Sequence, residues 1–385
     1  MFILKLVLRN TFRHTLRTSL TILSIIIALV AFGLLRTVIN SWYAGVDASS
    51  ASRLVTRNAI SLMFPLPLSY RDKIRAVDGV KTVSYGNWFG GIYKDRKNFF
   101  ANFAVDPKTY FQLNNEFMLT PEEHDAFIRD RKGFVAGRKL AKKFGWKIGD
   151  SVPLEGTIFP GSWEFVLRGI YKGKEKNTDE SLFFFHWEYL NETLRKTMPL
   201  RADKVGFYMV GVKDPARAVD VTVAIDRIFK NSLAETLTET EKAFQLSFIS
   251  MSEAVIIAIR LVSLVVIIII MAVAANTMAM TVRERTREYA VFKTLGFGAF
   301  RITAMIFGES LLITMTGCVL GIVLTYPAAG AFGRALGDYF PIFEVDNNIF
   351  TVYVGASLLV GVTAAVLPAW KAIRITIAEG LRRIE

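Results

Sequence analysis

Four long apolar runs, with one long globular segment between the first two, constrain this chain more than any other feature. The runs cover residues 20–38, 261–280, 302–326 and 351–367, and residues 349–350 can lengthen the last run before Pro368 stops it. About 20 helical residues rise roughly 30 Å, which matches the hydrocarbon core of a bilayer. The sequence therefore predicts four transmembrane helices. A secretory signal peptide is the alternative for the first run, but that run is long for one and no small-residue cleavage site directly follows it.

The segment between the first two runs is long enough to be a domain. It holds about 200 residues, whereas connections without secondary structure of their own rarely exceed about 15. Periodicity predicts helices at residues 68–77, 134–144 and 215–229, and strands at 80–85, 99–105, 165–171 and 205–212. The last helix has Val219, Val223 and Ile228 as apolar positions, and Thr120-Pro121-Glu122-Glu123 is typical of a capping box. This mixture predicts an α+β domain with one or two subdomains.

Basic residues near the ends of the runs predict one orientation, because cytoplasmic loops carry an excess of Lys and Arg. Such residues precede the first run, separate the second from the third, and follow the fourth: Lys5, Arg9, Arg13, Arg17; Arg283, Arg285, Arg287, Lys293, Arg301; Lys371, Arg374, Arg382, Arg383. Between the third and fourth runs, Arg334 stands against Asp338, Glu344 and Asp346. We expect both termini in the cytoplasm and the large domain outside. Arg36 and Arg260 would then anchor the outer interface, with a role in gating as the alternative.

Composition excludes several functional classes. There is one cysteine, Cys318, and the three histidines, His14, His124 and His186, are far apart, so neither a disulfide framework nor a zinc site is predicted. The net charge of +13 could indicate nucleic acid binding, but much of the basic excess flanks the apolar runs and is explained by topology. No catalytic constellation is visible. We predict no catalytic, cofactor-binding or metal-binding residues and no nucleic acid partner.

Two further segments have a pattern that suggests a mechanical role. Residues 237–260 mix polar and apolar side chains, and residues 236–277 contain no Pro or Gly, which predicts a continuous helix that extends the second span as a stalk, with residues 39–52 as its partner. Residues 281–296 read TVRERTREYAVFKTLG and predict an amphipathic helix with an apolar stripe, opposite-charge pairs and a glycine C-cap. The stripe is Val282, Tyr289, Phe292 and Leu295. Such a helix suits docking to a soluble partner, and an interfacial helix held by lipid headgroups is the alternative.

The same segment resembles the signature of the MacB/FtsX-type (type VII) ABC transporter permeases. That signature begins with Val, any residue, and then Glu-Arg-Thr-Arg-Glu-Ile-Gly. A Lys or Arg follows, before Ala-Leu-Gly. The matching residues are Val282, Glu284, Arg285, Thr286, Arg287, Glu288, Lys293, Leu295 and Gly296, and the departures are Tyr289, Ala290 and Thr294. The resemblance continues at Glu309-Ser310-Leu311, from Gly317 to Gly321, at residues 368–372 and at residues 379–382.

The resemblance implies a homodimeric permease in the bacterial inner membrane that works with two separate ABC ATPases. The coupling helix that touches the ATPase would comprise Glu284, Arg285, Arg287, Glu288, Tyr289, Phe292, Lys293 and Gly296. The chain contains no G-x-x-x-x-G-K-[ST] loop, so we expect ATP and Mg²⁺ to be bound by the partner, with no cofactor and no enzyme activity here. In this family, ATP hydrolysis drives movement of the outer domain, which is called mechanotransmission, and here the movement would export or extract a substrate. A periplasmic adaptor or substrate-binding protein and membrane lipids would be other partners.

Two alternatives stay open: a non-transporting signal transducer that activates a periplasmic partner such as a cell-wall hydrolase, and a membrane-anchored receptor or enzyme without an ATPase. Inside the third span, Glu309 is expected to make a structural hydrogen bond, with proton relay as the alternative. Gly317 and Gly321 form a small-xxx-small pattern for helix packing.

The expected fold class is a membrane α-helical protein (four transmembrane helices) with a large α+β extracytoplasmic domain inserted between helices 1 and 2. The expected segments are an N-terminal cytoplasmic amphipathic helix (1–19), transmembrane helix 1 with its stalk (20–44), the extracytoplasmic domain (45–236), the stalk with transmembrane helix 2 (237–280), the cytoplasmic coupling helix (281–301), transmembrane helix 3 (302–326), a short external loop (327–348), transmembrane helix 4 (349–369) and the cytoplasmic tail (370–385).

Overall fold

The computed structural model describes residues 2–47, 49–98, 100–175, 177–336, 342–343, 345–346 and 348–377. It divides the chain into two compact units. The helical unit comprises Met1–Ser41, Ser252–Leu336 and Phe343–Glu385, and the sheet unit comprises Trp42–Met251 and Gly337–Ile342. The tail motif at 379–382, the basic residues Arg382 and Arg383, the acidic residues Asp338 and Glu344, and the start of the strand predicted from residue 99 lie outside the described residues.

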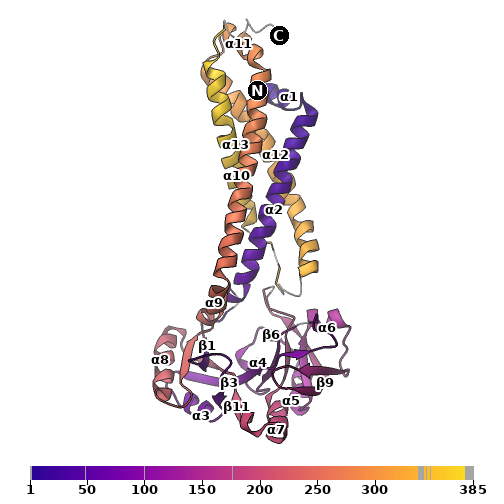
Figure 1. The fold of residues 1–385 in the computed structure, drawn as a ribbon, viewed down its shortest axis with the longest axis vertical. Coiled ribbons are helices and arrows are strands. Elements are labelled where there is room, and N and C mark those ends of the chain that lie inside the picture. The colour runs from indigo at the N-terminus through magenta and orange to yellow at the C-terminus, as the bar shows by residue number, and fades with distance from the viewer. Residues whose placement is uncertain are drawn as a thin grey trace. The chain divides into compact units, whose positions relative to one another are not determined.

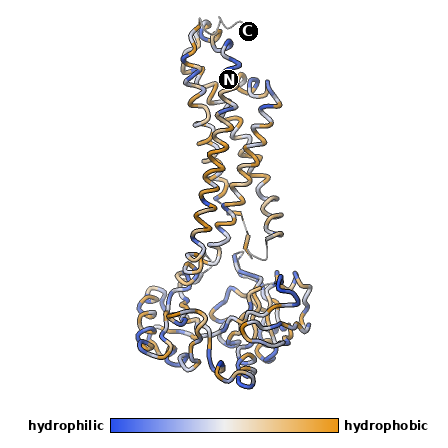
Figure 2. Tube along the Cα trace, in the orientation of Figure 1, coloured by the Kyte–Doolittle hydropathy of each residue, from blue (hydrophilic) through white to orange (hydrophobic). Residues whose placement is uncertain are grey.

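The helical unit confirms the prediction of four spans. Its elements are α1 (Phe2–Thr11), α2 (Thr15–Asp47), α10 (Glu253–Glu284), α11 (Thr286–Thr294), α12 (Ala299–Leu336) and α13 (Ile349–Arg374). Among the described residues, four helices are long and apolar enough to cross a membrane: α2, α10, α12 and α13. These helices run alongside one another (Figure 1), and apolar residues continue along much of their length (Figure 2).

Two predicted helix boundaries are wrong, and the predicted glycine C-cap at Gly296 is confirmed. Pro368 does not stop the fourth span, because it lies inside α13, and transmembrane helices tolerate proline where neighbouring groups satisfy the freed backbone. Residues 281–296 do not form one helix, since α10 runs to Glu284 and α11 begins at Thr286, with Arg285 between them at φ −99° and ψ 15°. Gly296 follows α11 with φ +83°, a left-handed conformation that suits glycine.

The predicted stalk is also interrupted. Residues 236–240 are a strand, β13 (Thr236–Thr240), which pairs with β1 (Arg53–Asn58), and the helix α9 (Glu241–Met251) begins only after it. Ser252, at φ −105° and ψ 10°, then separates α9 from α10. The division between the two units falls at this residue, whereas α2 passes from one unit into the other without a break.

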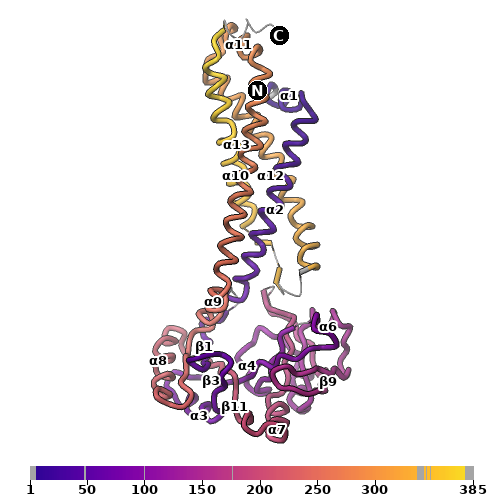
Figure 3. Tube along the Cα trace, viewed as in Figure 1, coloured from indigo at the N-terminus to yellow at the C-terminus, as the bar shows by residue number. Residues whose placement is uncertain are grey.

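In the described part of the sheet unit, eleven strands form one mixed sheet in the order β13-β1-β12-β3-β5-β10-β7-β9-β8-β4, with β6 paired to β9. Strands distant in sequence, such as β1 and β13, lie side by side (Figure 3). The other strands are β3 (Val80–Trp88), β4 (Gly91–Ile92), β5 (Asn102–Val105), β6 (Phe117–Met118), β7 (Gly133–Gly137), β8 (Ser151–Gly156), β9 (Gly161–Gly173), β10 (Phe183–His186) and β12 (Phe207–Val212). A separate pair joins β2 (Leu66–Pro67) to β11 (Lys204–Val205).

Helices cover this sheet and complete the α+β fold. They are α3 (Tyr70–Arg75), α4 (Tyr110–Leu113), α5 (Pro121–Arg129), α6 (Arg138–Phe144), α7 (Trp187–Thr197) and α8 (Ala218–Phe229). The capping box is confirmed at α5, where the Thr120 side chain accepts a hydrogen bond from the Glu123 backbone and the Glu123 side chain accepts one from the Thr120 backbone.

Two predictions within this domain are wrong in part. Residues 134–137 belong to β7, and only residues 138–144 form a helix, because Phe134, Val135 and Ala136 are fully buried between β9 and β10. The helix predicted at 215–229 exists as α8, but it buries Val221, Ile225 and Phe229. Val219, Val223 and Ile228, the predicted apolar positions, are exposed.

Candidate functional site

The predicted coupling segment is anchored by a buried arginine at the junction of α10 and α11. Arg285 Nε donates to Glu288 Oε2 at 2.9 Å, and an Arg285 terminal nitrogen donates to Glu309 Oε2 at 3.0 Å. The guanidinium also lies 5.4 Å from the centre of the Tyr289 ring. Its second terminal nitrogen, Nη2, is buried without a hydrogen-bond partner among the described residues. Arg285 therefore ties α11 to α12 and keeps one donor free.

Glu309 lies in α12 and is buried with only 5% of its surface exposed. A carboxylate among apolar helices needs a polar partner, and Arg285 supplies one from 24 positions earlier in the chain. The adjacent Ser310 hydroxyl donates to the Gly361 carbonyl oxygen at 2.7 Å, which joins α12 to α13. Through Glu309 and Ser310, this stretch of α12 is therefore bonded both to the junction of α10 and α11 and to α13.

Two basic residues near the N-terminus, Arg13 and Arg17, also pair with acidic residues of the coupling segment. Arg13 forms an ion pair with Glu288, and Arg17 donates to Glu284 at 2.6 Å. Burial alone would raise the pKa of Glu288, but hydrogen bonds from Arg285 and Arg13 hold that pKa below its usual value. Glu284 and Glu288 are therefore paired with residues before the first span, in addition to the Arg285–Glu288 pair within the segment.

Lys293 fastens the other end of α11. Its Nζ donates to the carbonyl oxygens of Ile373 and Ile375, both at 2.6 Å. These carbonyls are at the end of α13, where a cation also complements the helix dipole.

One face of α11 is left uncovered by the residues that the structure describes. Arg287, Val291 and Leu295 are spaced four residues apart and are all exposed, Leu295 to 69%. Tyr289 and Ala290 are buried on the opposite face, and Phe292 is half-buried beside the Phe297 ring at 5.3 Å. The predicted apolar stripe therefore does not share one face, because Tyr289 points inward and Leu295 outward. We call Arg287, Val291 and Leu295 the coupling surface.

Gly317 and Gly321 both face α2. A Cβ atom at Gly317 would meet Ile25 Cγ2 at 2.6 Å, and one at Gly321 would meet Leu29 Cβ at 3.2 Å. The small residues therefore allow close approach of α12 and α2. In the same bundle, the Tyr353 hydroxyl donates to the Leu29 carbonyl oxygen at 2.7 Å.

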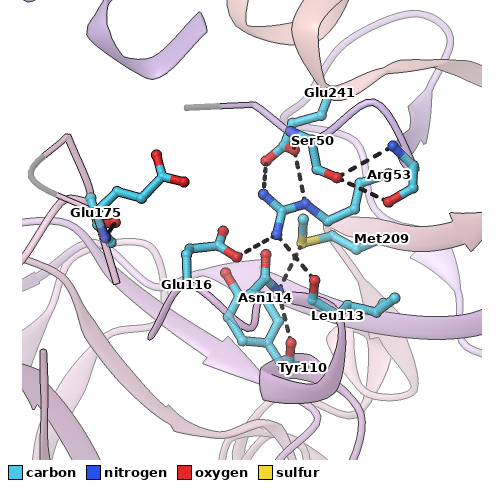
Figure 4. A network of polar contacts seen from close by, with 11 residues as sticks. Ser50, Arg53, Tyr110, Leu113, Asn114, Glu116, Glu175, Met209 and Glu241 are labelled. Carbon is cyan, nitrogen blue, oxygen red and sulfur yellow. Dashed lines mark hydrogen bonds and ion pairs between the residues drawn. The ribbon is translucent and has the colours of Figure 1, made fainter. Parts of the chain in front are cut away.

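A second buried arginine, Arg53, was not predicted from the sequence (Figure 4). It is the first residue of β1, its side chain is 5% exposed, and all three guanidinium nitrogens are bonded. The partners are Glu241 at 2.8 and 3.0 Å, Glu116 at 2.7 Å and the Leu113 carbonyl oxygen at 3.1 Å. Burial would lower the pKa of Arg53, but the two carboxylates outweigh it and raise that pKa.

The Arg53 network lies where the chain enters and leaves the sheet unit. Glu241 is the first residue of α9, and its carboxylate also accepts a hydrogen bond from the Ser50 backbone at 2.7 Å. Ser50 and Arg53 follow α2 directly, so Glu241 binds the segment after α2 to the helix that precedes α10. Only a strand-initial arginine and a helix-initial glutamate signal this in the sequence, and neither is specific.

Four apolar helices, with a sheet domain inserted after the first and a braced short helix between the second and third, define a permease-like membrane protein. Comparison with protein families makes the class specific. The FtsX-like permease C-terminal family matches residues 260–377, and the MacB-like periplasmic core domain family matches residues 18–228. The chain belongs to the MacB/FtsX-type family of ABC transporter permeases, which confirms the resemblance seen in the signature segment.

Several known proteins are similar to this chain. The uncharacterized ABC transporter permease MJ1507 of Methanocaldococcus jannaschii is 25% identical over 323 residues, which cover 80% of this chain and 77% of that protein. The uncharacterized ABC transporter permease protein Rv0987 of Mycobacterium tuberculosis is 23% identical over 68% of this chain, but the match spans only 30% of that protein's length.

The macrolide export ATP-binding/permease protein MacB of Psychrobacter cryohalolentis is 32% identical over 108 residues, which cover 28% of this chain and 16% of that protein. Among solved structures, the periplasmic region of MacB from Actinobacillus actinomycetemcomitans aligns with a TM-score of 0.38 at 8% identity, covering 53% of this chain and 95% of that structure.

Proposed function

We propose that this chain is a permease subunit that converts ATP hydrolysis by a separate cytoplasmic ATPase into movement of its sheet unit, for export or extraction of a substrate outside the membrane. The coupling surface carries this proposal. It combines one cation with two exposed apolar side chains on a helix whose other face is fixed, which suits a protein partner better than water. The proposal includes a homodimer with two ATPases, which bind the ATP and Mg²⁺, and cytoplasmic termini in a bacterial inner membrane.

The contacts behind the coupling surface suggest how a push on α11 would spread. Arg285 and Lys293 connect α11 to α12 and to the end of α13, and Glu288 connects it to Arg13. A displaced α11 would therefore carry the bundle with it instead of bending alone. Within the sheet unit, Glu241 at the start of α9 binds Ser50 and Arg53, which follow α2 in the chain.

Copurification from native membranes tests this function. The wild-type chain should recover an ABC ATPase, and the double variant Arg287→Glu, Leu295→Ser should lose it, since the variant alters only side chains that point away from the bundle. Arg334→Glu makes the same charge change on an exposed residue near the end of α12 and should keep the ATPase. Absence of any ATPase with the wild-type chain would contradict the proposal.

The same preparation addresses the alternative of a signal transducer. A transporter should also recover an adaptor or a substrate-binding protein, whereas a transducer should recover a cell-wall hydrolase bound to the sheet unit. Protease digestion of oriented vesicles checks the topology, because the sheet unit and the two termini should be cleaved from opposite sides.

A further inference from the structure

Two segments of the sheet unit that carry exposed basic side chains pack against one another. One is the turn between β4 and β5, and the other is α6 with the residues that follow it. The Tyr93 ring at the start of the turn lies 5.1 Å from the Phe144 ring and 5.2 Å from the Trp146 ring. The exposed cations of the two segments form what we call the basic patch: Lys94, Arg96, Lys97, Lys142, Lys143 and Lys147.

The aromatic rings hold the two halves of the basic patch together. The Lys94 ammonium lies 4.9 Å from the centre of the Tyr93 ring, and the Lys143 ammonium lies 5.2 Å from the centre of the Phe144 ring. Because Tyr93 and Trp146 are buried, these rings are a fixed base and not a mobile surface layer. Cations from two distant parts of the sequence are therefore kept on one aromatic cluster.

Acidic residues offset only part of this charge. Asp95 and Asp150 accept hydrogen bonds from the backbones of Lys97 and Lys147, at 3.0 and 2.8 Å, and Glu155 borders the patch from β8. Five of the six cations make no ion pair among the described residues: Lys94, Arg96, Lys97, Lys142 and Lys147. The basic patch therefore keeps a net positive charge that faces solvent.

We propose that the basic patch binds the phosphates of anionic phospholipid headgroups in the membrane that the four helices cross. Five of its cations are lysines, which act as flexible point charges and suit phosphates that move within a lipid surface. Ile148, directly after Lys147, is 57% exposed and supplies an apolar side chain for the same interface.

The covalent connection to the spans favours a lipid surface over a soluble acidic protein. The chain enters the sheet unit from α2 without a break, so the bilayer is present at a high effective concentration, whereas a soluble partner has to be captured from solution. Binding would hold the sheet unit against the membrane until a stroke releases it. The inference goes beyond the proposed function and does not depend on it, because lipid binding requires no ATPase.

Fluorescence quenching of the full chain in nanodiscs tests the proposal. Cys318 is buried, so a Cys318→Ser background allows a single label at Ile148→Cys or, as a matched control, at Val219→Cys. Val219 is exposed on α8, which packs on β13 at the opposite end of the sheet order from β4. The nanodiscs contain phosphatidylcholine alone or with an equal fraction of phosphatidylglycerol, and each includes a trace of lipid with a nitroxide on its headgroup.

Phosphatidylglycerol should increase quenching at residue 148 and leave residue 219 unchanged. Sodium chloride at about 1 M should abolish the increase, because it screens charges separated by more than about 3 Å. Each basic residue near an anionic surface strengthens binding about fivefold, so Lys142→Gln with Lys147→Gln should lower the ratio of quenched to unquenched label by up to about 25-fold.

A second double variant separates the basic patch from the net charge of the unit. Lys213→Gln with Lys230→Gln removes the same charge from exposed residues that flank α8 and should leave the quenching at residue 148 unchanged. An equal loss in both double variants would overturn the proposal, and so would an equal increase at residues 148 and 219. Equal quenching at residue 148 in the two kinds of nanodisc would also overturn it and would favour an acidic protein as the occupant.

Discussion

Among the described residues two arginines are buried, Arg53 and Arg285, and their guanidinium groups are satisfied to different extents. Each lies against two glutamates, and each joins segments that are distant in sequence. Arg53 in the sheet unit has every nitrogen bonded, to Glu241, Glu116 and a backbone carbonyl. Arg285 in the helical unit leaves one nitrogen unpaired among the described residues and shares Glu288, which is 35% exposed, with Arg13.

This difference suggests different mechanical roles. A fully bonded buried network has a single good geometry, because any displacement leaves a buried group unsatisfied. In a network with a partly exposed partner, a broken bond costs less, because the exposed carboxylate can bond to water instead. The Arg53 network therefore suits a fixed joint, whereas the Arg285 network can keep α11 tied to α12 through Glu309 while its contact with Glu288 changes.

Loss of Arg53 should give the largest effect. Arg53→Leu leaves the partly buried Glu241 and Glu116 without their cation, and removal of one member of a buried pair costs about 3–5 kcal/mol. We expect the sheet unit to unfold at correspondingly lower denaturant, measured by hydrogen exchange of β1 and β13 in the full chain.

Arg57→Leu is the matched control for that experiment. Arg57 is on the same strand and pairs with Glu239 at 3.1 Å, but both side chains are more exposed than Arg53. Its removal should cost about 1 kcal/mol. Equal effects of the two substitutions would show that Arg53 is an ordinary ion pair and would remove the contrast with Arg285.

Loss of Arg285 should be the second largest effect. Arg285→Gln leaves Glu309 without its guanidinium, and an unsatisfied buried partner costs about 1–3 kcal/mol. Because one nitrogen of Arg285 is already unpaired, the cost should be smaller than at Arg53. Thermal unfolding in detergent measures it, and Glu309→Gln, which keeps an acceptor for Arg285, should be milder. A loss larger than that of Arg53→Leu would reverse the comparison.

The sequence was sufficient for the features that depend on local pattern. Apolar length predicted the four spans, and the signature segment predicted the family. Buried strand residues such as Phe134 and Val135 were predicted to be helical. Both faces of their strand are buried, so the sequence lacks the alternation of polar and apolar residues that would indicate a strand. The pairs Arg285–Glu309 and Arg53–Glu241 join residues 24 and 188 positions apart, and nothing in the local pattern selects those partners.

A third buried basic side chain, His186 of β10, extends the comparison to a group that stays neutral. Its Nε2 donates to the Phe127 carbonyl oxygen, and its Nδ1 is buried without a partner among the described residues. Burial lowers the pKa of His186 below its usual 6.5. Below about pH 6.5 the unfolded chain therefore binds a proton that the folded chain does not, so stability should fall as the pH falls.

Hydrogen exchange of β10 between about pH 7.5 and pH 5.5 measures this dependence. His186→Gln should flatten it, because glutamine does not titrate. Burial raises the pKa of the Asp179 carboxyl, which acts in the opposite sense at more acidic pH, so the difference between wild type and variant isolates the histidine. An unchanged slope in the variant would assign the pH dependence to other groups.

The smallest effect on stability should come from the ion pair between Arg13 and Glu288. Arg13 is 58% exposed, and an exposed ion pair contributes about 0.2–1 kcal/mol. Arg13→Glu and Glu288→Arg should each lower stability slightly, and the charge-swapped double variant should recover part of the loss. Glu288→Arg also places a cation beside Arg285, so it should cost more than Arg13→Glu, and the swap should not restore the wild-type value. Full recovery would mean that Glu288 serves Arg13 alone and that Arg285 depends only on Glu309, which would make the second network as rigid as the first.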